Sequence, residues 1–565
     1  MIKSTLIIAI FFTQSYLFSQ KTNSDYKTTP IEEQITLQTN TDFYLSGESI
    51  LYKTICVNAI NKETISLSKI AYVELVNNEN NIILKHKQVI NKGVTFNDFF
   101  IPTNIETGNY KIIAYTNLTQ KKNEYSSKDI FILNPYVPFP EKYKENKNNQ
   151  EVSNTLTSIN ENTFISKVNP NKKEYQKREK VSVTINDNLQ GNFILNVIKI
   201  DSIPALQDQK NADLFSTIKS DNIETNTTNL SFPETRGEIF SGKITSKNNV
   251  DVLENKKIAL SIPGENFDFK ITSTDKKGNF KFLMDNFNGD EAYFQIYEKD
   301  KENYKIEILE NQSIKPKNIE REIKINPNYA NAFLKRSIAN QIQNIYYHTK
   351  SDTLFAPKKS KPFYFGSDKE YVLKDYSPQN TVKEIFIEII PEVYISKKDG
   401  KQTFSVNDYE VNSSDIYYNT IVLVDGFLLQ DVDEILTFDP AFFTKINFVN
   451  KGYFFNKYLF NGVVNLTTKD LNYTPKVDHD YIIKKKLDRP QLDKKYFTVD
   501  YSKNNLKKIP DYRYQLAWEP NITDISNQKP LEFYTSDVPG NYKIQIEGIT
   551  KNGEAVLMEN FIKVN

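Results

Sequence analysis

Apolar and polar residues alternate in short runs along most of this chain. Tyr, Phe, Ile and Val recur in these runs, which Asn, Asp, Gly and Lys residues bound, as in residues 111–115 and 543–546. β-Branched and aromatic residues fit a pleated surface of which one face is buried. The pattern therefore predicts a mainly β protein made of sandwiches, in which two sheets share one core.

Helical spacing occurs in two places. Between residues 329 and 349, and again between 381 and 390, apolar residues recur every three or four positions and share one face. Pro391 directly follows the second run and predicts its end. We expect both helices to pack on the sheet that follows them, although such faces can also seat a partner.

Polar stretches rich in Lys and Asn divide the chain into modules. A chain of 565 residues is long enough for about four domains of ordinary size. The last stretch contains the basic run 484–486, which is typical of a solvated linker. The stretches that we interpret as linkers or long loops are residues 141–160, 207–229, 350–361 and 472–495.

The first module, residues 31–136, shows an ordered set of strand and turn signals. Residues 42–48 contain the turn residue Gly47, residues 71–75 form a strand pattern, and residues 96–116 contain the last strand. This order resembles the macroglobulin domain, an immunoglobulin-like sandwich. The resemblance implies a fold of two packed β-sheets.

Two further modules follow. Residues 160–232 contain a weaker copy of the macroglobulin-like pattern, in which Arg178 occupies the position of the turn glycine. Residues 236–325 are similar to the carboxypeptidase-regulatory-like or transthyretin-like sandwich, and Asp275 with Gly278 predicts a tight hairpin turn in it. Each module is expected to be a separate sandwich.

The last module, residues 496–565, has another immunoglobulin-like pattern. Asn552 and Gly553 form a strong hairpin signal. Trp518 is the only tryptophan, and we interpret it as a core anchor rather than as a platform for a sugar ring. The fold class is therefore mainly β, with tandem immunoglobulin-like or macroglobulin-like sandwiches and one small α+β domain.

That α+β domain, within residues 326–471, contains the motif that most resembles a known functional module. A buried strand pattern ends at Asp425-Gly426, and a second strand pattern runs from Gly462 to Lys469. Together they resemble the plug domain of TonB-dependent outer-membrane receptors. These four residues are the candidate plug-like motif. Asp-Gly is also a common turn pair, so a purely structural role is the simpler interpretation.

Plug domains of those receptors sit inside a large barrel. Residues 470–565 are too few for the roughly 16 strands that a plug-filled barrel requires. We therefore expect a plug-like domain without its own barrel, which packs on its own neighbours or docks on a separate barrel protein.

Export is predicted from the N-terminus. Lys3 precedes a short apolar run, and residues 1–20 have the pattern of a secretory signal peptide. No other transmembrane segment is expected. The only cysteine, Cys56, excludes an internal disulfide and is not followed by the Glu-Gln of a macroglobulin thioester, so we expect a buried thiol rather than a protease trap.

Enzymatic and nucleic-acid functions find little support. The net charge of +1 provides no field for nucleic acid. His86, His348 and His479 are the only histidines and lie in different modules, and no zinc, nucleophile-elbow or phosphate-loop motif occurs. We therefore expect no catalytic residues, no metal and no cofactor.

Three functional hypotheses remain open. The first is an exported binding or scaffold protein of the Gram-negative envelope, in the periplasm or at the cell surface, that associates with an outer-membrane barrel or transport complex. The second is the substrate-binding component of a nutrient uptake system for peptide or glycan. The third is hydrolysis of envelope polymers by distant carboxylates.

Overall fold

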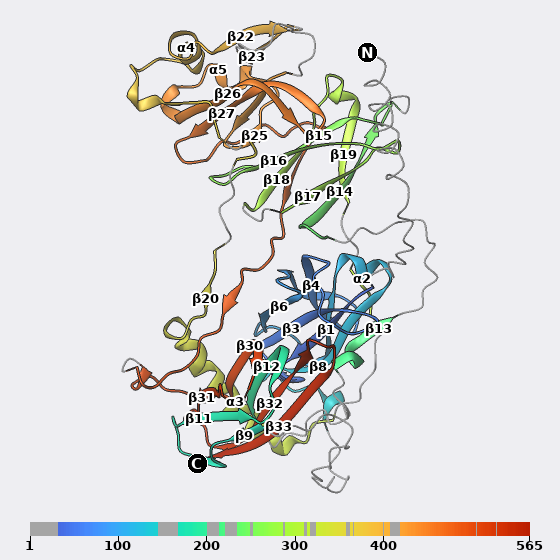
Figure 1. Ribbon diagram of the computed structural model, residues 1–565, viewed down its shortest axis with the longest axis vertical. Helices are drawn as coiled ribbons and strands as arrows, with labels where there is room; N and C mark the ends of the chain where they lie inside the picture. The colour runs from blue at the N-terminus through green and yellow to red at the C-terminus, as the bar shows by residue number, and fades with distance from the viewer. Residues whose placement is uncertain are drawn as a thin grey trace, which may run out of the picture.

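The chain folds into two bodies that lie one above the other (Figure 1). The lower body contains the first sandwich and a second sandwich at the C-terminus, and the upper body contains a third sandwich and a small α/β module. The computed structural model describes residues 32–144, 168–200, 214–220, 234–248, 252–285, 289–309, 313–316, 324–356, 362–364, 366–398, 400–406, 419–503, 506–526 and 528–565. The expected signal peptide, residues 1–20, lies outside these ranges.

The first sandwich has strand orders β1-β3-β6 and β13-β8-β7-β4-β5, and β2 pairs in parallel with β8. Its core contains Cys56, so the predicted buried thiol is confirmed. Burial raises the pKa of this thiol well above its ordinary value, which keeps it protonated and unreactive. The elements are β1 (Glu33–Thr39), β2 (Phe43–Leu45), β3 (Ser49–Asn58), β4 (Ile70–Asn77), β5 (Ile82–Val89), β6 (Val94–Phe100), β7 (Gly108–Tyr115), α2 (Asn117–Lys121), β8 (Glu124–Leu133) and β13 (Ile218–Ser220).

The second and last modules of the sequence analysis share one fold. Strands from 168–199 and 515–564 alternate in the same two sheets, with orders β10-β33-β32-β12-β30 and β31-β11-β9. We expected two sandwiches here, but neither stretch alone supplies enough strands for two layers around a core. We call this unit the composite sandwich. Its strands are β9 (Val168–Pro170), β10 (Glu174–Tyr175), β11 (Lys180–Ile185), β12 (Leu189–Lys199), β30 (Gln515–Ile525), β31 (Leu531–Tyr534), β32 (Gly540–Thr550) and β33 (Ala555–Val564).

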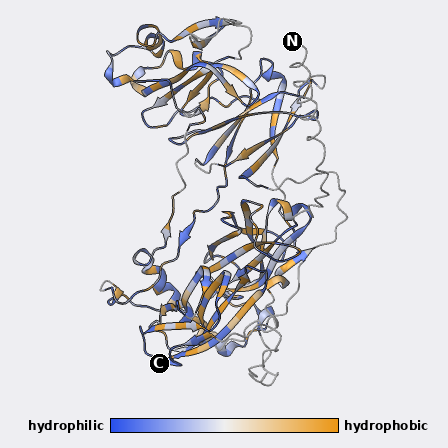
Figure 2. Ribbon diagram, in the orientation of Figure 1, coloured by the Kyte–Doolittle hydropathy of each residue, from blue (hydrophilic) through white to orange (hydrophobic). Residues whose placement is uncertain are grey.

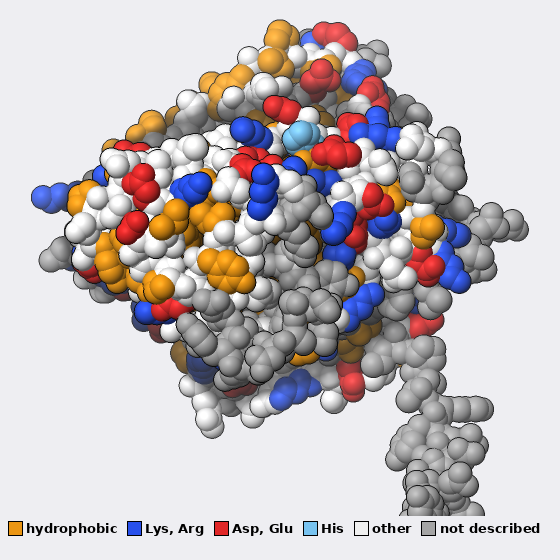
Figure 3. Space-filling model, turned by 90° about the horizontal axis from the view of Figure 1, so that it is seen from above, with side chains coloured by type: hydrophobic (Ala, Val, Ile, Leu, Met, Phe, Trp, Pro, Cys, Tyr) orange, Lys and Arg blue, Asp and Glu red, His pale blue; other side chains and the backbone are white. Residues whose placement is uncertain are grey.

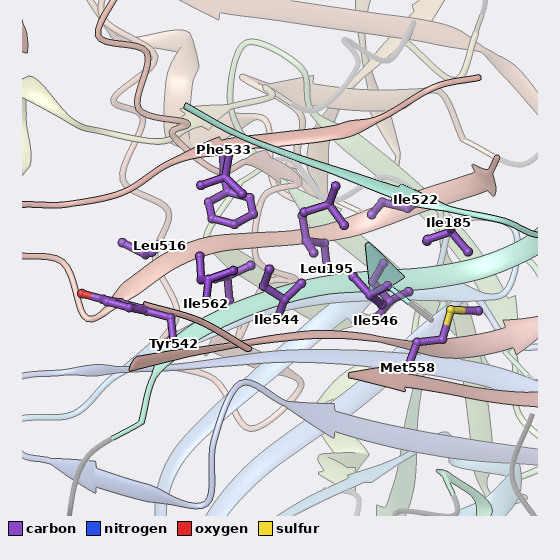
Figure 4. Packing of buried hydrophobic residues seen from close by; sticks show 14 of the residues in the cluster. Ile185, Leu195, Leu516, Ile522, Phe533, Tyr542, Ile544, Ile546, Met558 and Ile562 are labelled. Carbon is purple, nitrogen blue, oxygen red and sulfur yellow. The ribbon is translucent and has the colours of Figure 1, made fainter. Parts of the chain in front are cut away.

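Both stretches fill the core of the composite sandwich. Figure 4 shows Ile185 and Leu195 of the first stretch among Phe533, Ile544 and Met558 of the second. All five side chains are buried, and hydropathy colouring shows apolar residues throughout these strands (Figure 2). Hydrophobic burial therefore holds together segments that are far apart in the chain.

Arg178 also joins the two stretches. Its backbone is left-handed, with φ of 59°, a conformation that glycine adopts without strain. Its guanidinium Nε donates to Asp537 Oδ1 at 2.6 Å, and its Nη2 donates to the carbonyl oxygen of Ile509 at 3.0 Å. The charge-assisted contact across the sheets explains why arginine stands at this turn.

The third sandwich is inserted between the two halves of the composite sandwich, and we call it the inserted sandwich. Its sheets have the orders β17-β14-β19 and β16-β15-β18-β28. The hairpin turn predicted at Asp275 and Gly278 is present, because Gly278 has φ of 79° and its N–H donates to the Asp275 carbonyl at 3.0 Å. The basic run 484–486 belongs to β28 and is not a linker. The strands are β14 (Glu238–Ser246), β15 (Lys257–Ile262), β16 (Asp268–Ser273), β17 (Asn279–Met284), β18 (Glu291–Ile296), β19 (Tyr304–Leu309) and β28 (Ile482–Lys486).

The α/β module, residues 369–468, lies at the end of the upper body and is called the distal module (Figure 1). Its sheet has the order β21-β26-β27-β24-β25, with β24 parallel to β27. Two short helices and a separate hairpin pack on one face of this sheet around a shared apolar core. The elements are β21 (Lys369–Val372), α4 (Val382–Glu388), β22 (Val393–Lys398), β23 (Lys401–Val406), β24 (Ile421–Val424), β25 (Phe427–Leu428), α5 (Asp433–Leu436), β26 (Phe443–Phe455) and β27 (Tyr458–Thr468).

Both predicted helices exist, but only one lies where we expected. Helix α4 packs on the distal sheet, whereas α3 (Ala330–Ile345) packs on the first sandwich in the lower body. Phe333 of α3 stacks on Phe43 at 5.8 Å, and the Arg336 Nε donates to Glu48 Oε1 at 2.7 Å. The expectation that α3 packs on the plug-like sheet was wrong, because its amphipathic face does not specify which sheet covers it.

Two paired strands of the described chain run between the bodies. After α3, the chain rises through β20 (Thr353–Leu354), and it descends through β29 (Lys494–Lys495), which pairs antiparallel with β20. The distal module therefore leaves and rejoins the lower body through these paired strands (Figure 1), whereas β14 to β19 of the inserted sandwich precede α3 in the chain. Within the described ranges, no helix is both long and apolar enough to cross a membrane.

Truncating Phe333 tests the position of α3. Phe333→Ala removes a buried ring between the helix and the first sandwich, so we expect a loss of about 3 kcal/mol in the free energy of unfolding. Leu334→Ala, on the exposed side of the same helix, should cost less than about 0.5 kcal/mol. Differential scanning calorimetry of both variants measures this difference, and equal effects would contradict the observed packing.

Candidate functional site

The Asp425-Gly426 pair forms the turn between β24 and β25. Asp425 has φ of 52° and Gly426 has φ of 90°, so both residues adopt the left-handed conformation of a tight hairpin turn. The Asp425 carboxylate is buried and accepts hydrogen bonds from the Thr468 N–H at 2.8 Å, the Thr468 hydroxyl at 2.6 Å and the Tyr473 N–H at 3.3 Å. This side chain ties the end of β24 to the end of β27.

Gly426 lies against the inserted sandwich. A Cβ atom at this position would be 2.2 Å from Cβ of Phe267, closer than any real contact, so only glycine fits. The Asp425 carbonyl accepts a hydrogen bond from Gly264 N–H at 2.9 Å, and Leu428 N–H donates to the Ser261 hydroxyl at 3.0 Å. The turn is therefore the joint between the distal module and the inserted sandwich.

The other two motif residues differ in exposure. Gly462 is buried in β27 with φ of 73°, and a Cβ there would be 2.4 Å from the Val449 carbonyl oxygen. Lys469 directly follows β27, and its side chain is exposed. The structure thus brings Asp425 near Thr468 at the end of β27, next to Lys469, but it leaves only Lys469 accessible to a partner.

An apolar core covers one face of the distal sheet. Phe269 of β16 stacks on Phe455 of β26 at 5.8 Å, and Tyr297 stacks on Phe460 of β27 at 6.2 Å. Burial of this area makes the inserted sandwich and the distal module one packed unit. The plug-like sheet is therefore covered by its own chain on this side. The cluster includes Ala259, Phe267, Phe269, Ile271, Tyr364, Ile421, Leu423, Leu428, Val449, Tyr458, Phe460 and Val463.

The accessible surface of the distal module lies on its other side and was missed by the sequence analysis. Ile387 of α4 is 61% exposed, Tyr394 of β22 is 47% exposed, and Tyr376 is also exposed. Seen from above, apolar side chains lie among charged ones on the surface of the upper body (Figure 3). The sequence did contain a signal for the exposure of Ile387, because this apolar residue lies outside the apolar face of the predicted helix.

A second feature, also missed, is a cluster of buried ionisable side chains between the two bodies. Glu234 lies shortly before β14 and contacts Tyr72 of the first sandwich. Glu238 is the first residue of β14 and contacts Lys87 of the first sandwich. Lys87 Nζ lies 2.5 Å from Glu238 Oε1. These residues are widely separated in sequence, so no local pattern could have shown their contact.

The three histidines are far from one another in the fold. His86 lies in β5, where burial lowers its pKa to about 4 and its Nδ1 lies 2.8 Å from the Tyr52 hydroxyl. His348 follows α3, and His479 precedes β28. In the described part of the chain, no three His, Cys, Asp or Glu side chains are grouped so that they could hold a metal ion.

Comparison with known proteins gives no family. No family model matches the chain, and no curated protein matches it. Among solved structures, the chain is similar to Escherichia coli alpha-2-macroglobulin activated by porcine elastase, with 8% identity, a TM-score of 0.23 and coverage of 94% of this chain and 43% of that one. Salmonella alpha-2-macroglobulin reacted with methylamine gives 9% identity, a TM-score of 0.22 and coverage of 94% and 39%.

A shorter likeness concerns a CARDB domain from Pyrococcus furiosus in complex with di-metal ions. It has 14% identity and a TM-score of 0.14, and it covers 18% of this chain and 93% of that one. The chain spans less than half the length of the alpha-2-macroglobulins. TM-scores this low do not establish a shared fold, so the β-sandwich architecture rests on the strand pairings of this chain itself.

Two glycines test the role of the Asp425-Gly426 turn. Gly426→Ala adds backbone strain and a clash with Phe267, and we expect it to lower the free energy of unfolding of the upper body by about 3 kcal/mol or more. Gly400→Ala is the matched control, since Gly400 has φ of 85° and no atom within 4 Å of an added Cβ. It should cost only about 1 kcal/mol.

Calorimetry of the two glycine variants measures this difference. Equal destabilisation would mean that Phe267 yields and that the turn is not a tight joint.

Proposed function

We propose that this chain is an exported, non-enzymatic binding or scaffold protein of the Gram-negative envelope. Its distal module contacts an outer-membrane barrel protein or transport complex from the periplasmic or the cell-surface side. One observation carries this proposal: the distal module lies at the end of the upper body, with exposed apolar side chains on the side that its own chain leaves open.

The position of that surface defines the mode of contact. The Asp425-Gly426 turn and one face of the distal sheet are buried against the inserted sandwich, so they are not available to a partner. Helix α4 and the hairpin β22–β23 remain, and their exposed Ile387 and Tyr394 can be buried in an interface. Partner binding is thus assigned to these elements and not to the plug-like motif.

Crosslinked envelopes provide the test. A tagged chain is purified after crosslinking and detergent extraction, and the co-purified proteins are identified by mass spectrometry. We expect one barrel protein in near-equal amount, with at least about a tenfold loss for the Ile387→Glu, Tyr394→Glu double variant, because charged groups buried at an interface lack hydration.

Phe561→Glu is the matched control. Phe561 is 48% exposed, comparable to Tyr394 at 47%, but it lies in β33 of the lower body. The control should retain the barrel protein. Equal recovery with the double variant and the control would contradict the assignment to the distal module, and absence of any specific protein would favour instead a substrate-binding component for peptide or glycan.

A further inference from the structure

The two interdomain joints of the upper body differ in chemistry. Its internal joint is an apolar core, whereas its contact with the first sandwich consists of polar and ionisable side chains. Within the described ranges, no apolar core cluster contains residues of both the first and the inserted sandwich. An apolar joint is insensitive to protons, but a joint of buried ionisable groups is not.

Glu234 is the centre of this polar joint. Its side chain is 0% exposed, and its Oε1 accepts hydrogen bonds from the Ile239 N–H at 2.9 Å and from the Tyr72 hydroxyl at 3.3 Å. Its backbone carbonyl accepts a hydrogen bond from the Lys69 N–H at 2.8 Å. Glu234 therefore bonds the first strand of the inserted sandwich and two positions of the first sandwich at once.

The charges around Glu234 do not balance it. Lys87 of β5 is committed to Glu238, and no described cation lies within ion-pair distance of Glu234. Glu238 is a second buried carboxylate close by, and its Oε2 has no hydrogen-bond partner among the described residues. When both carboxylates are ionised, Glu234 is therefore the one that has no cation at ion-pair distance among the described residues, because Lys87 pairs with Glu238.

The other ionisable groups near the joint lie beside Glu238 or Tyr72 rather than at the Glu234 carboxylate. Arg489 lies near Glu238, and its Nε donates to the Gly289 carbonyl at 2.6 Å. Behind Tyr72, the Tyr115 ring stacks at 5.3 Å and Lys85 Nζ lies 3.0 Å from Glu74. Burial is the largest cause that raises the pKa of Glu234, to about 7, and the neighbouring Glu238 charge adds to it.

We propose that the contact of Glu234 with the first sandwich is a proton-controlled hinge between the two bodies. With Glu234 protonated, the joint is closed. When Glu234 ionises, the contact opens and the upper body swings about residues 491–493, the segment that is bonded to β5 and its following turn in the lower body. That segment remains attached to the first sandwich, because Gln491 N–H donates to the Lys87 carbonyl at 2.8 Å and Asn91 Nδ2 donates to Asp493 Oδ2 at 2.8 Å. The hinge is independent of which partner the distal module binds.

The direction of the pH effect follows from proton binding. An ordinary glutamate has a pKa of 4.5, so the closed joint binds more protons than the open one between that value and about 7. The stability of the closed joint is therefore highest at low pH and falls as the pH rises through this window. From about pH 5.5 to about pH 8.5, the opening equilibrium constant should rise about thirtyfold.

Hydrogen exchange of the full chain measures opening at the joint itself. The Lys69 amide donates to the Glu234 carbonyl across the joint, so peptides that contain Lys69 report whether the joint is closed. After correction for intrinsic exchange, we expect their protection to fall about thirtyfold between about pH 5.5 and about pH 8.5, with a midpoint near 7. Amides in the core of the composite sandwich should show no such change.

Two variants separate Glu234 from general pH effects. Glu234→Gln keeps the shape and hydrogen-bond acceptor but cannot ionise, so its joint should stay protected at both pH values. Glu254→Gln removes an exposed carboxylate of the same sandwich and should behave as the unmodified chain. Loss of protection in Glu234→Gln, or unchanged protection in the unmodified chain across this pH range, would overturn the hinge.

Hydrogen exchange of the unmodified chain tests the hinge even if Glu234→Gln does not fold. A fall in protection at the joint with a midpoint between about pH 6 and about pH 8 supports the hinge, and no transition in that interval overturns it. Small-angle scattering at the same two pH values should show a larger maximum dimension at high pH. Partner recovery in envelopes does not enter this measurement, so failure of the proposed function leaves it intact.

Discussion

The architecture depends on one set of backbone hydrogen bonds, those that place β12 between β30 and β32. The partners are far apart in the chain: the Lys199 N–H at the end of β12 donates to the Tyr514 carbonyl at 2.8 Å, and Val197 pairs with Ala517 of β30. Closing so long a loop costs conformational entropy, which the shared apolar core of the composite sandwich offsets. Everything between the two stretches is thereby held as an insertion with both ends at the same place.

This constraint shapes the rest of the molecule. The insertion itself returns to the lower body at α3, and from there β20 and β29 run side by side between the bodies. The return path also completes the inserted sandwich, where the basic run 484–486 pairs with β18 as its edge strand. Inside the upper body, the Asp425-Gly426 turn then packs on Phe267 and unites the distal module with that sandwich.

The plug-like motif consequently has an internal role. Asp425 satisfies three donors of its own chain, and Gly426 provides the close approach that the joint needs. A sequence motif that resembles a partner-binding module is here used to attach one domain to the next, which moves the accessible surface to α4 and the β22–β23 hairpin. The lower joint is polar instead, with Glu234 and Glu238 buried opposite Lys87.

The sequence by itself determined the local features of this protein. Alternating residues specify the strands, Gly278 and Asp275 specify a hairpin turn, and the apolar neighbours of Cys56 specify a buried thiol, because each depends on residues close in the chain. The tertiary structure alone decided which stretches share a sheet, which sheet covers α3 and what lies against Gly426 and Glu234. An apolar face predicts burial but not its partner, since the hydrophobic effect is non-directional, and only the three-dimensional packing of distant segments selects one.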